Sequence, residues 1–400
     1  MQFQILYSYD AISGDDWGRL TVNRSAFQQA AWYRAAESSG SLRLYVATDD
    51  RGRPVLALPA FRLERRGHYY SSPSLLLTGD GEVAMLRERS MSLKPLDRAR
   101  EAPWYPAVVT MSPYGYRGGV LAAPEANRDM LGPFIRFVLD SCSDEGVRVV
   151  SFHYLVEQED SDLLDILIAH NGTPAVLGAS CILPLRWSTP EDYLSWLGPS
   201  RRTVGRDYRR ADRRPETYWT ASEDSPPAAD AELVTQMFAA TMRRHGECDI
   251  PVSLLHSGAA GVAGTSVHFY ARDAFGLRSA LLALRQGGTL YPKFFGTNRE
   301  RGDYFPLGYW NTLRYAISSQ LRSIDFGGGA TRAKLWRGAD IYWDLGVFFF
   351  LDPRLRAVAE PLSQHLSAAN HAYFTELAER WSHRHAAPLL PDGLQRSIIG

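Results

Sequence analysis

The stretch FGLRSALLALRQGGTLYPKFFGTN (residues 275–298) contains two runs of strand-forming residues around the turn Gly287-Gly288. Turn glycines between such runs are typical of an antiparallel hairpin. The stretch SLRLYVATDDRGRPVLALPAFRLE (residues 41–64) repeats this form around residues 50–53. The sequence therefore predicts one hairpin in each half of the chain.

Each hairpin is followed by a helical pattern and then by a short strand. Residues 127–155 predict a helix of about 17 residues and a strand over 147–154. Residues 303–328 predict a helix that begins near Pro306 and a strand over 323–327. The order strand, turn, strand, helix, strand thus occurs twice, which indicates a duplicated fold.

The duplication predicts an N-terminal domain over residues 1–188 and a C-terminal domain over residues 189–385. Residues 65–110, which are rich in Arg, Ser and Tyr, are expected to form a surface insertion in the first domain. The last residues, 386–400, are expected to form a loose tail.

The composition is that of a folded protein with no excess of either charge. The 400 residues are 45% hydrophobic and 22% charged, with a formal net charge of zero. This balance excludes a disordered chain and argues against a protein that coats nucleic acid nonspecifically. The first residues lack the apolar core of a signal peptide, and no apolar run reaches the roughly 20 residues that cross a bilayer. We therefore expect a soluble, cytoplasmic protein without a membrane span.

Neither a metal centre nor a disulfide framework is predicted. Cys142, Cys181 and Cys248 are isolated and form no Cys-x-x-Cys pair. The stretch RRHGECDIP (residues 243–251) has no spacing typical of metal ligands. Isolated Ser and His residues likewise give no support for a catalytic triad.

The stretch IDFGGGATRAKLWRG (residues 324–338) combines three glycines with a lysine, which raises the question of a phosphate site. A P-loop requires Gly-Lys followed by Ser or Thr, but here Leu335 follows Lys334. The dinucleotide fingerprint also fails, because Arg332 occupies the position of its last glycine. Lys334 is one of only three lysines among 44 basic residues, so we expect it to be kept for its compact ammonium group.

The duplicated pattern resembles the tandem GNAT halves of the Fem-type aminoacyltransferases and of related peptidoglycan-biosynthesis-like acyltransferases. MSPYGYRGGVL (residues 111–121) is similar to a Ser-Pro-x-Gly-Tyr-x-Gly-Gly segment in their first half. YLSWLGPSRRTVGRDYRRADRR (residues 193–214) resembles the arginine-rich helix that opens their second half. Residues 290–338 are similar to their closing block, in which Tyr-aromatic-Gly, a helix and an acidic strand precede Lys-x-x-Arg-Gly.

This resemblance covers residues 40–380 and implies an α/β fold of two tandem GNAT-like domains. Each domain is then a mixed, mostly antiparallel sheet flanked by helices. The resemblance also implies that Lys334 lies beside the acceptor amine and the acyl ester, with Arg337 binding substrate in the same motif. A fixed cation aimed at the tetrahedral oxyanion would stabilise it, and removing one such donor costs about 10²–10³ in rate. Asp325 is expected either to take the amine proton or to hold the lysine.

Further binding residues are expected around this site. Tyr291 and Lys293 lie two residues apart on the predicted hairpin strand, so alternation would place them on one face, beside Lys334. Tyr114 and Tyr116 either bind substrate or pack in a glycine-rich turn. The arginine-rich helix is expected to contact tRNA phosphates, or else to be a solvated face, through Arg201, Arg202, Arg206, Arg209 and Arg210.

The favoured function is therefore transfer of an aminoacyl group from aminoacyl-tRNA to a small-molecule amine, without ATP, metal or other cofactor. Peptidoglycan itself is a less favoured acceptor, because no heptad run interrupts residues 232–350. An acyl-CoA donor is the second hypothesis. RERGDYFP (residues 299–306) keeps Arg299 of the GNAT pyrophosphate loop but places an acid, Asp303, beside it. The third hypothesis is a non-catalytic binding protein that retains the fold.

Overall fold

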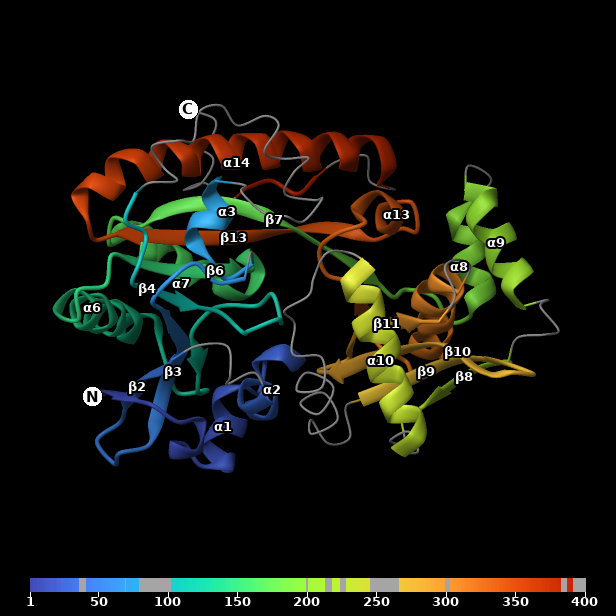
Figure 1. Cartoon of the computed structure of the whole chain (residues 1–400), viewed down its shortest axis with the longest axis horizontal. Helices are drawn as coiled ribbons and strands as arrows, with labels where there is room; N and C mark the ends of the chain where they lie inside the picture. Colours follow the sequence, from blue (N-terminus) through green and yellow to red (C-terminus); the bar gives the residue numbers. More distant parts are fainter. Residues whose placement is uncertain are drawn as a thin grey trace. The chain divides into compact units, whose positions relative to one another are not determined.

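The computed structural model describes residues 1–35, 41–68, 70–78, 102–198, 201–212, 218–223, 228–244, 266–298, 303–382 and 387–390. The chain divides into two compact units (Figure 1). Unit 1 consists of Met1–Ala179, Tyr342–Glu376 and Pro388–Gly400, and unit 2 consists of Ser180–Ile341 and Leu377–Ala387.

Unit 1 is built on a mixed sheet. Its first six strands, in sheet order, are β1 (Gln2–Leu6), β2 (Ser41–Thr48), β3 (Pro54–Leu63), β4 (Ala107–Thr110), β6 (Val149–Leu155) and β13 (Asp340–Phe350). Residues 173–179 of β7 (Thr173–Pro184) follow β13. The first four strands pair antiparallel in succession, β4 and β6 pair parallel, and β6 and β13 pair antiparallel. The short β5 (Leu121–Ala122) adds to β3.

Unit 2 repeats this topology strand for strand. Its sheet order is β8 (Tyr218–Ser222), β9 (Ser266–Asp273), β10 (Gly276–Gln286), β11 (Thr289–Thr297), β12 (Ser323–Asp325) and the end of β7 (Thr173–Pro184). The first four strands again pair antiparallel, β11 and β12 pair parallel, and β12 and β7 pair antiparallel. The predicted mixed, mostly antiparallel sheets are therefore confirmed.

The two predicted hairpins are real, but they are not equivalent to one another. Residues 275–298 form β10 and β11, whereas residues 41–64 form β2 and β3, which correspond in sheet order to β9 and β10. The counterpart of β11 is β4, which lies at the end of the predicted insertion, residues 65–110. Within that insertion the structure also describes α3 (Pro73–Thr78), while residues 79–101 lie outside the described part.

The predicted extent of the second domain differs from that of unit 2. The prediction continued the second domain to residue 385, but residues 342–376 belong to unit 1. β13 leaves unit 2 and completes the sheet of unit 1, and β7 does the reverse. An apolar strand pattern specifies burial but not the sheet that a strand joins, so this exchange could not be read from the sequence. Most of the predicted loose tail lies outside the described residues.

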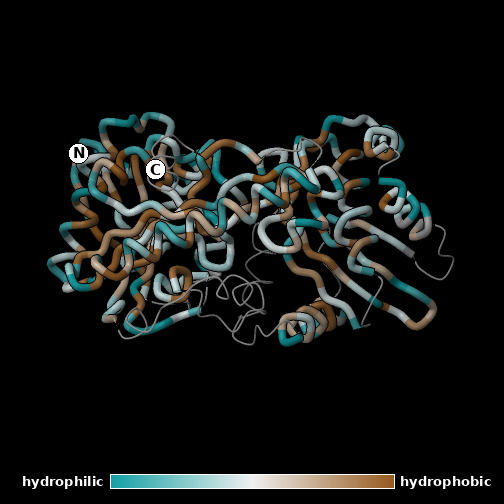
Figure 2. Tube along the Cα trace, turned by 90° about the horizontal axis from the view of Figure 1, so that it is seen from above, coloured by the Kyte–Doolittle hydropathy of each residue, from teal (hydrophilic) through white to brown (hydrophobic). Residues whose placement is uncertain are grey.

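Helices cover the strands of each unit, and hydrophobic segments recur along the chain in both units (Figure 2). In unit 1 they are η1 (Tyr9–Ala11), α1 (Gly14–Leu20), η2 (Ala26–Gln28), α2 (Ala30–Ala35), α3, α6 (Arg128–Asp144), α7 (Glu157–Ala169) and most of α14 (Pro353–Trp381). In unit 2 they are α8 (Pro190–Leu197), α9 (Arg202–Asp212), α10 (Ala228–Arg244), the π-helix η5 (Pro306–Asn311), α12 (Thr312–Ser318) and α13 (Thr331–Leu335).

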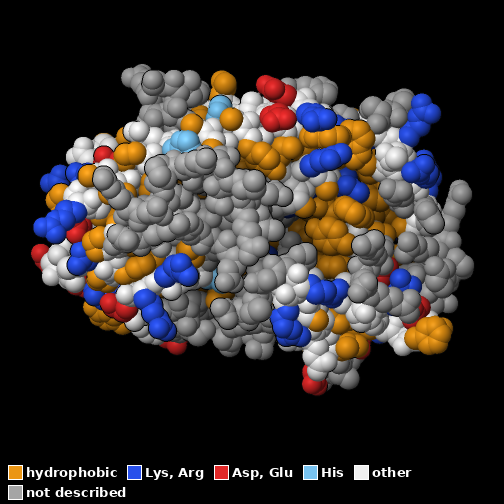
Figure 3. All heavy atoms as spheres, turned by 45° about the horizontal axis from the view of Figure 1, so that its top comes forward, with side chains coloured by type: hydrophobic (Ala, Val, Ile, Leu, Met, Phe, Trp, Pro, Cys, Tyr) orange, Lys and Arg blue, Asp and Glu red, His pale blue; other side chains and the backbone are white. Residues whose placement is uncertain are grey.

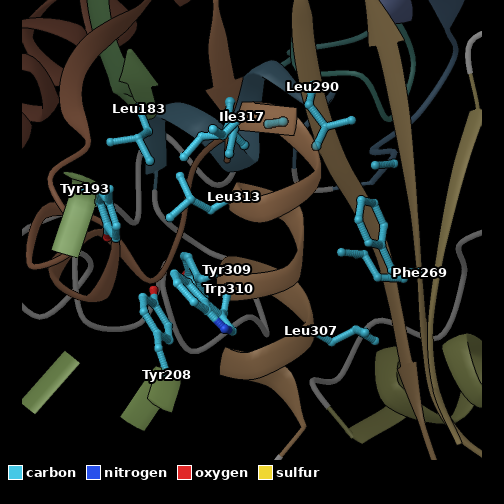
Figure 4. Packing of buried hydrophobic residues seen from close by; sticks show 14 of the residues in the cluster. Leu183, Tyr193, Tyr208, Phe269, Leu290, Leu307, Tyr309, Trp310, Leu313 and Ile317 are labelled. Atoms are coloured by element: carbon cyan, nitrogen blue, oxygen red, sulfur yellow. The ribbon is translucent and has the colours of Figure 1, made fainter. Parts of the chain in front are cut away.

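The core of unit 2 forms around η5 and α12 (Figure 4). Leu307 and Leu313 of these helices belong to one buried cluster with Leu290 of β11. α9 joins the cluster through Tyr208, whose ring stacks on Trp310 at a centroid distance of 4.7 Å. This packing fixes the helix that leads into β12, and with it the chain that follows β12.

Candidate functional site

The two central strands of unit 2 separate at one end. β11 and β12 pair only through Thr289 with Ser323 and Leu290 with Ile324. Beyond this point β12 stays paired with β7, whereas β11 continues in its pairing with β10. The chain that follows β12 therefore begins where the pairing between β11 and β12 has ended.

That chain is the glycine turn, which we define as residues 326–329. Gly327 and Gly329 have φ values of 64° and 73°, a backbone region that glycine adopts without a steric cost. The N–H of Phe326 donates to the carbonyl of Cys181 at 2.9 Å, and the N–H of Cys181 donates to the carbonyl of Gly327 at 3.0 Å. β7 thus anchors one side of the glycine turn.

Lys334 anchors the other side from α13. Its Nζ donates to the carbonyl oxygens of Phe326, Gly327 and Gly328 at 2.8, 2.9 and 2.7 Å. Lys334 is only 4% exposed and is therefore a buried lysine. An ammonium group has three N–H donors, and here three carbonyls accept from them. Lys334 therefore closes the glycine turn, and a direct catalytic role for it stays a prediction.

Asp325 is the last residue of β12 and is also buried. Its Oδ1 accepts a hydrogen bond from the N–H of Gly327 at 2.8 Å. The carboxylate therefore caps the first peptide group of the glycine turn. Whether it also takes a proton from an amine stays a prediction.

Arg337 lies one turn after Lys334 and is surrounded by aromatic rings. Its guanidinium carbon is 4.4 Å from the ring centroid of Phe305, 4.8 Å from that of Tyr309 and 5.8 Å from that of Tyr208. These distances are within the range of cation–π attraction. Nη1 donates to the carbonyl of Ala333 at 2.9 Å, whereas the buried Nε has no hydrogen-bond partner in the part of the chain that the structure describes.

The surroundings of Arg337 are fixed from a second direction. The hydroxyl of Tyr193 donates to the carbonyl of Arg337 at 3.0 Å. Burial raises the pKa of Tyr193 well above the usual value for tyrosine, so this hydroxyl stays protonated. Gly338 has a φ of 89°, and a Cβ there would lie 2.5 Å from the ring of Trp196. Only glycine fits at this position, which explains the Arg-Gly pair.

Aromatic side chains beside Arg337 reach the surface. Tyr304 and Phe305 are 40% and 43% exposed, and their ring centroids are 5.4 Å apart. Figure 3 shows hydrophobic side chains gathered on one face in the half of the view that holds unit 2, with basic side chains at their border. The site therefore offers an apolar surface next to a buried cation.

Tyr291 and Lys293 lie at an irregularity of β11. Leu282 and Ala283 are neighbours on β10, but they pair with Phe294 and Pro292 of β11. Lys293 is thus the extra residue of a β-bulge, which interrupts the two-residue alternation. The residue pattern gave no signal for this bulge, and a face shared by Tyr291 and Lys293 stays a prediction.

Tyr114 and Tyr116 belong to unit 1, whereas Lys334 and Arg337 belong to unit 2. Both tyrosines have left-handed backbones, with φ values of 57° and 52°. Their ring centroids lie 5.1 and 5.4 Å from that of Tyr70. They therefore take part in a tyrosine cluster of unit 1, and their binding of substrate stays a prediction.

The arginines of α9 differ in exposure from Arg201, which directly precedes the helix. Arg202, Arg206 and Arg209 are exposed. Arg201 is instead 5% exposed and donates to the carbonyls of Leu335 and Trp381 at 3.3 and 2.8 Å. The prediction that Arg201 contacts phosphates is therefore corrected, because its guanidinium holds the start of α9 against the chain near α13. The side chain of Arg210 and the whole of Arg299 lie outside the described residues.

The helical period could have identified Arg201 as buried. Val204, Tyr208 and Ala211 form the buried face of α9, and stepping back three residues from Val204 leads to Arg201. The aromatic residues around Arg337 could not be found in this way, because they come from separate segments of the chain.

Asp303 was expected to disturb an anion-binding loop, but the structure gives it another role. Arg278 of β10 donates to its two carboxylate oxygens, from Nε at 3.1 Å and from Nη2 at 3.0 Å. Ser279 Oγ adds a third bond at 2.9 Å. Asp303 is 2% exposed, and its carbonyl accepts from the N–H of Leu307. This buried ion pair therefore fixes the start of the helix that leads to the site.

No group of His, Cys, Asp and Glu residues with the geometry of a metal site occurs among the described residues. Within the same residues, no helix is both long enough and apolar enough to span a bilayer.

Comparison with known proteins gives a consistent picture. A family model described as FemAB-like, peptidoglycan biosynthesis/recognition, matches residues 96–385. The crystal structure of FemX is similar with a TM-score of 0.57 at 12% identity, covering 90% of this chain and 100% of that one. The C-terminal domain of a protein from Agrobacterium fabrum described as a lysylphosphatidylglycerol synthetase has a TM-score of 0.54 at 11% identity, covering 88% of this chain and 96% of that one. At these identities the similar structures show the fold. No match is found among curated proteins.

Proposed function

Because this chain belongs to the FemAB-like family of peptidoglycan biosynthesis and recognition, we propose that it is an N-acyltransferase that moves an aminoacyl group from aminoacyl-tRNA to an amine. The proposed acceptor is a small molecule, and the reaction uses neither ATP nor a metal. The acceptor nitrogen attacks the ester carbonyl carbon and forms the new C–N bond. The tetrahedral oxyanion then collapses, the ester C–O bond breaks, and the ribose hydroxyl leaves with the proton that the amine has lost.

One observation carries this proposal most directly. The glycine turn lies where β11 and β12 have separated, and Lys334 closes it with three hydrogen bonds. A rigid turn beside a buried guanidinium and exposed aromatic rings supports a site that binds an acyl group and stabilises negative charge on its carbonyl oxygen. Such stabilisation is what transfer from an ester to an amine requires.

The exposed arginines of α9 support tRNA as the donor. The double change Arg202→Ala with Arg206→Ala is expected to raise KM for charged tRNA and to leave kcat nearly unchanged, because it removes uniform binding. Each lost phosphate contact should also reduce the slope of log affinity against log salt by about one unit. Steady-state kinetics at two salt concentrations measure both effects.

A matched control for this prediction is Arg51→Ala with Arg136→Ala, two exposed arginines of unit 1. This control should leave KM for charged tRNA unchanged. Activity that is insensitive to salt and unaffected by the α9 changes would contradict the tRNA donor.

Acyl-CoA remains a second candidate donor, and one observation favours keeping it. The charge of Asp303 is balanced by Arg278, so this acid does not repel a pyrophosphate as the sequence had suggested. If acyl-CoA is the donor, Arg299→Ala should raise KM for CoA. Incubation with charged tRNA pools and, separately, with acyl-CoAs decides between them, because only the tRNA-dependent product is lost after RNase treatment. Absence of product with both donors would favour the non-catalytic alternative.

A further inference from the structure

The geometry of the glycine turn determines where its N–H groups point. In a planar trans peptide the C=O and the following N–H point in opposite directions. The carbonyls of Gly327 and Gly328 are directed at Lys334 Nζ. The N–H groups of Gly328 and Gly329 must therefore point away from the ammonium group.

The side of the glycine turn that faces away from Lys334 is called its outer side. The first peptide of the turn shows what can bind there. The carbonyl of Phe326 also accepts from Lys334, and the N–H on its far side, that of Gly327, donates to the Asp325 carboxylate. An anionic oxygen thus already lies on the outer side of one of the three peptides. Each of these peptides is polarised by the ammonium group behind it, which strengthens its N–H as a donor.

The next two N–H groups are open. Gly328 is exposed and Gly329 is partly exposed, and within the described residues neither N–H has an acceptor. φ is positive at Gly327 and Gly329 but not at Gly328. Such alternation along successive residues is typical of backbone nests, which bind anions through converging N–H groups.

A second observation points to a ligand beside this turn. The Nε of Arg337 is buried and has no partner among the described residues. Unpaired buried donors are rare and indicate a missing ligand or water. The ring of Tyr309 lies 4.8 Å from the guanidinium carbon of Arg337 and 4.9 Å from the ring of Phe326, the first residue of the turn.

We propose that the N–H groups of Gly328 and Gly329 form the oxyanion hole of the acyl transfer, and that Lys334 is a positioning residue that aims them. This inference rests on the proposed N-acyltransferase function. As the amine adds to the carbonyl carbon, the electron pair of the C=O bond moves to its oxygen, and these two N–H groups donate to that oxygen. Lys334 supplies the charge behind the peptides without contacting the substrate.

The most specific test replaces the N–H group of residue 328 with an oxygen atom. Gly328→Ala keeps the N–H at an exposed residue whose φ is not positive, and it is the reference protein. Lactic acid at position 328 has the same methyl group but replaces the N–H with an ester oxygen. We expect kcat of the lactic acid form to be about 100-fold lower than that of Gly328→Ala, with KM for both substrates unchanged. Equal kcat values for the two proteins would overturn the proposal.

A double-mutant cycle tests the role of Lys334. If this residue acts through the turn, the lactic acid replacement should cost little further activity in Lys334→Ala, because both changes remove the same donors. Additive losses would show that Lys334 acts directly and would overturn its positioning role. A wild-type protein that forms no amide with charged tRNA or acyl-CoA would instead refute the proposed function, and the inference with it. Circular dichroism confirms that each variant is folded.

Discussion

Lys334→Ala is expected to reduce kcat/KM about 1000-fold, and by at least about 100-fold, since more than one oxyanion donor loses its place. The ammonium group is the common partner of three carbonyls in the glycine turn. Without it the carbonyls of Phe326 and Gly328 lose this donor, that of Gly327 keeps only the N–H of Cys181, and the turn relaxes toward solvent. The loss should appear mainly in kcat, because the affected groups act on the transition state.

The same change should cost only about 1–3 kcal/mol of unfolding free energy, because the carbonyls can rebind water at the partly exposed turn. Arg332→Ala is the matched control, since Arg332 is an exposed cation of the same helix whose guanidinium lies over the ring of Trp381. It should keep normal kinetics. A folded Lys334→Ala protein with normal turnover would remove Lys334 from the site.

Two replacements sharpen this test. Lys334→Arg should remain impaired, because a planar guanidinium cannot direct three donors at three converging carbonyls. Lys334→Cys treated with bromoethylamine regains an ammonium group of nearly the original length and should regain activity. Wild-type protein given the same treatment controls for modification of other cysteines. Lack of recovery in the aminoethylated protein would contradict a role for the ammonium group.

Arg278→Met is expected to lower the free energy of unfolding by about 3–5 kcal/mol. The carboxylate of Asp303 is 2% exposed and would remain buried without its bidentate partner. The start of η5 depends on this carboxylate, so the change should also reduce activity. Denaturant unfolding followed by circular dichroism measures the loss.

The control is Arg272→Met on the neighbouring strand. Arg272 also pairs with a carboxylate, that of Asp230 at 2.6 Å, but its side chain is 37% exposed. A pair with this exposure contributes about 0–1 kcal/mol. Adding Asp303→Asn to Arg278→Met should recover part of the stability, because the buried charge at position 303 is then removed. Equal losses for Arg278→Met and Arg272→Met would contradict the importance of burial.

The sequence predicted the duplicated fold because its signals are local. Turn glycines, helical periods and short apolar strands recur in the same order in both halves, and the sheets repeat that order. The exchange of β7 and β13 was missed, because it depends on long-range pairing that no local pattern records. The two predicted hairpins occupy different positions in the sheet order, and this was missed for the same reason.

The site was predicted in part. Lys334, Asp325 and Arg337 were chosen through a resemblance. The structure places Asp325 next to the glycine turn, Lys334 in contact with it, and Arg337 one helical turn after Lys334. The residues around Arg337 were missed, since Tyr208 and Phe305 are almost a hundred residues apart in sequence and meet only after folding. A β-bulge displaced Lys293, and bulges have no reliable residue signal.

The exchange of β7 and β13 has a consequence for how the protein is made. A ribosome that has released residues 1–179 has produced a sheet in which β13, the strand between β6 and β7, is not yet synthesised. The edge of β6 stays unpaired until more than 150 further residues have been synthesised. During that time it can pair with another nascent chain. Truncation between the halves would leave that edge open permanently. The C-terminal segment should therefore restore solubility to an N-terminal fragment when the two are expressed as separate polypeptides.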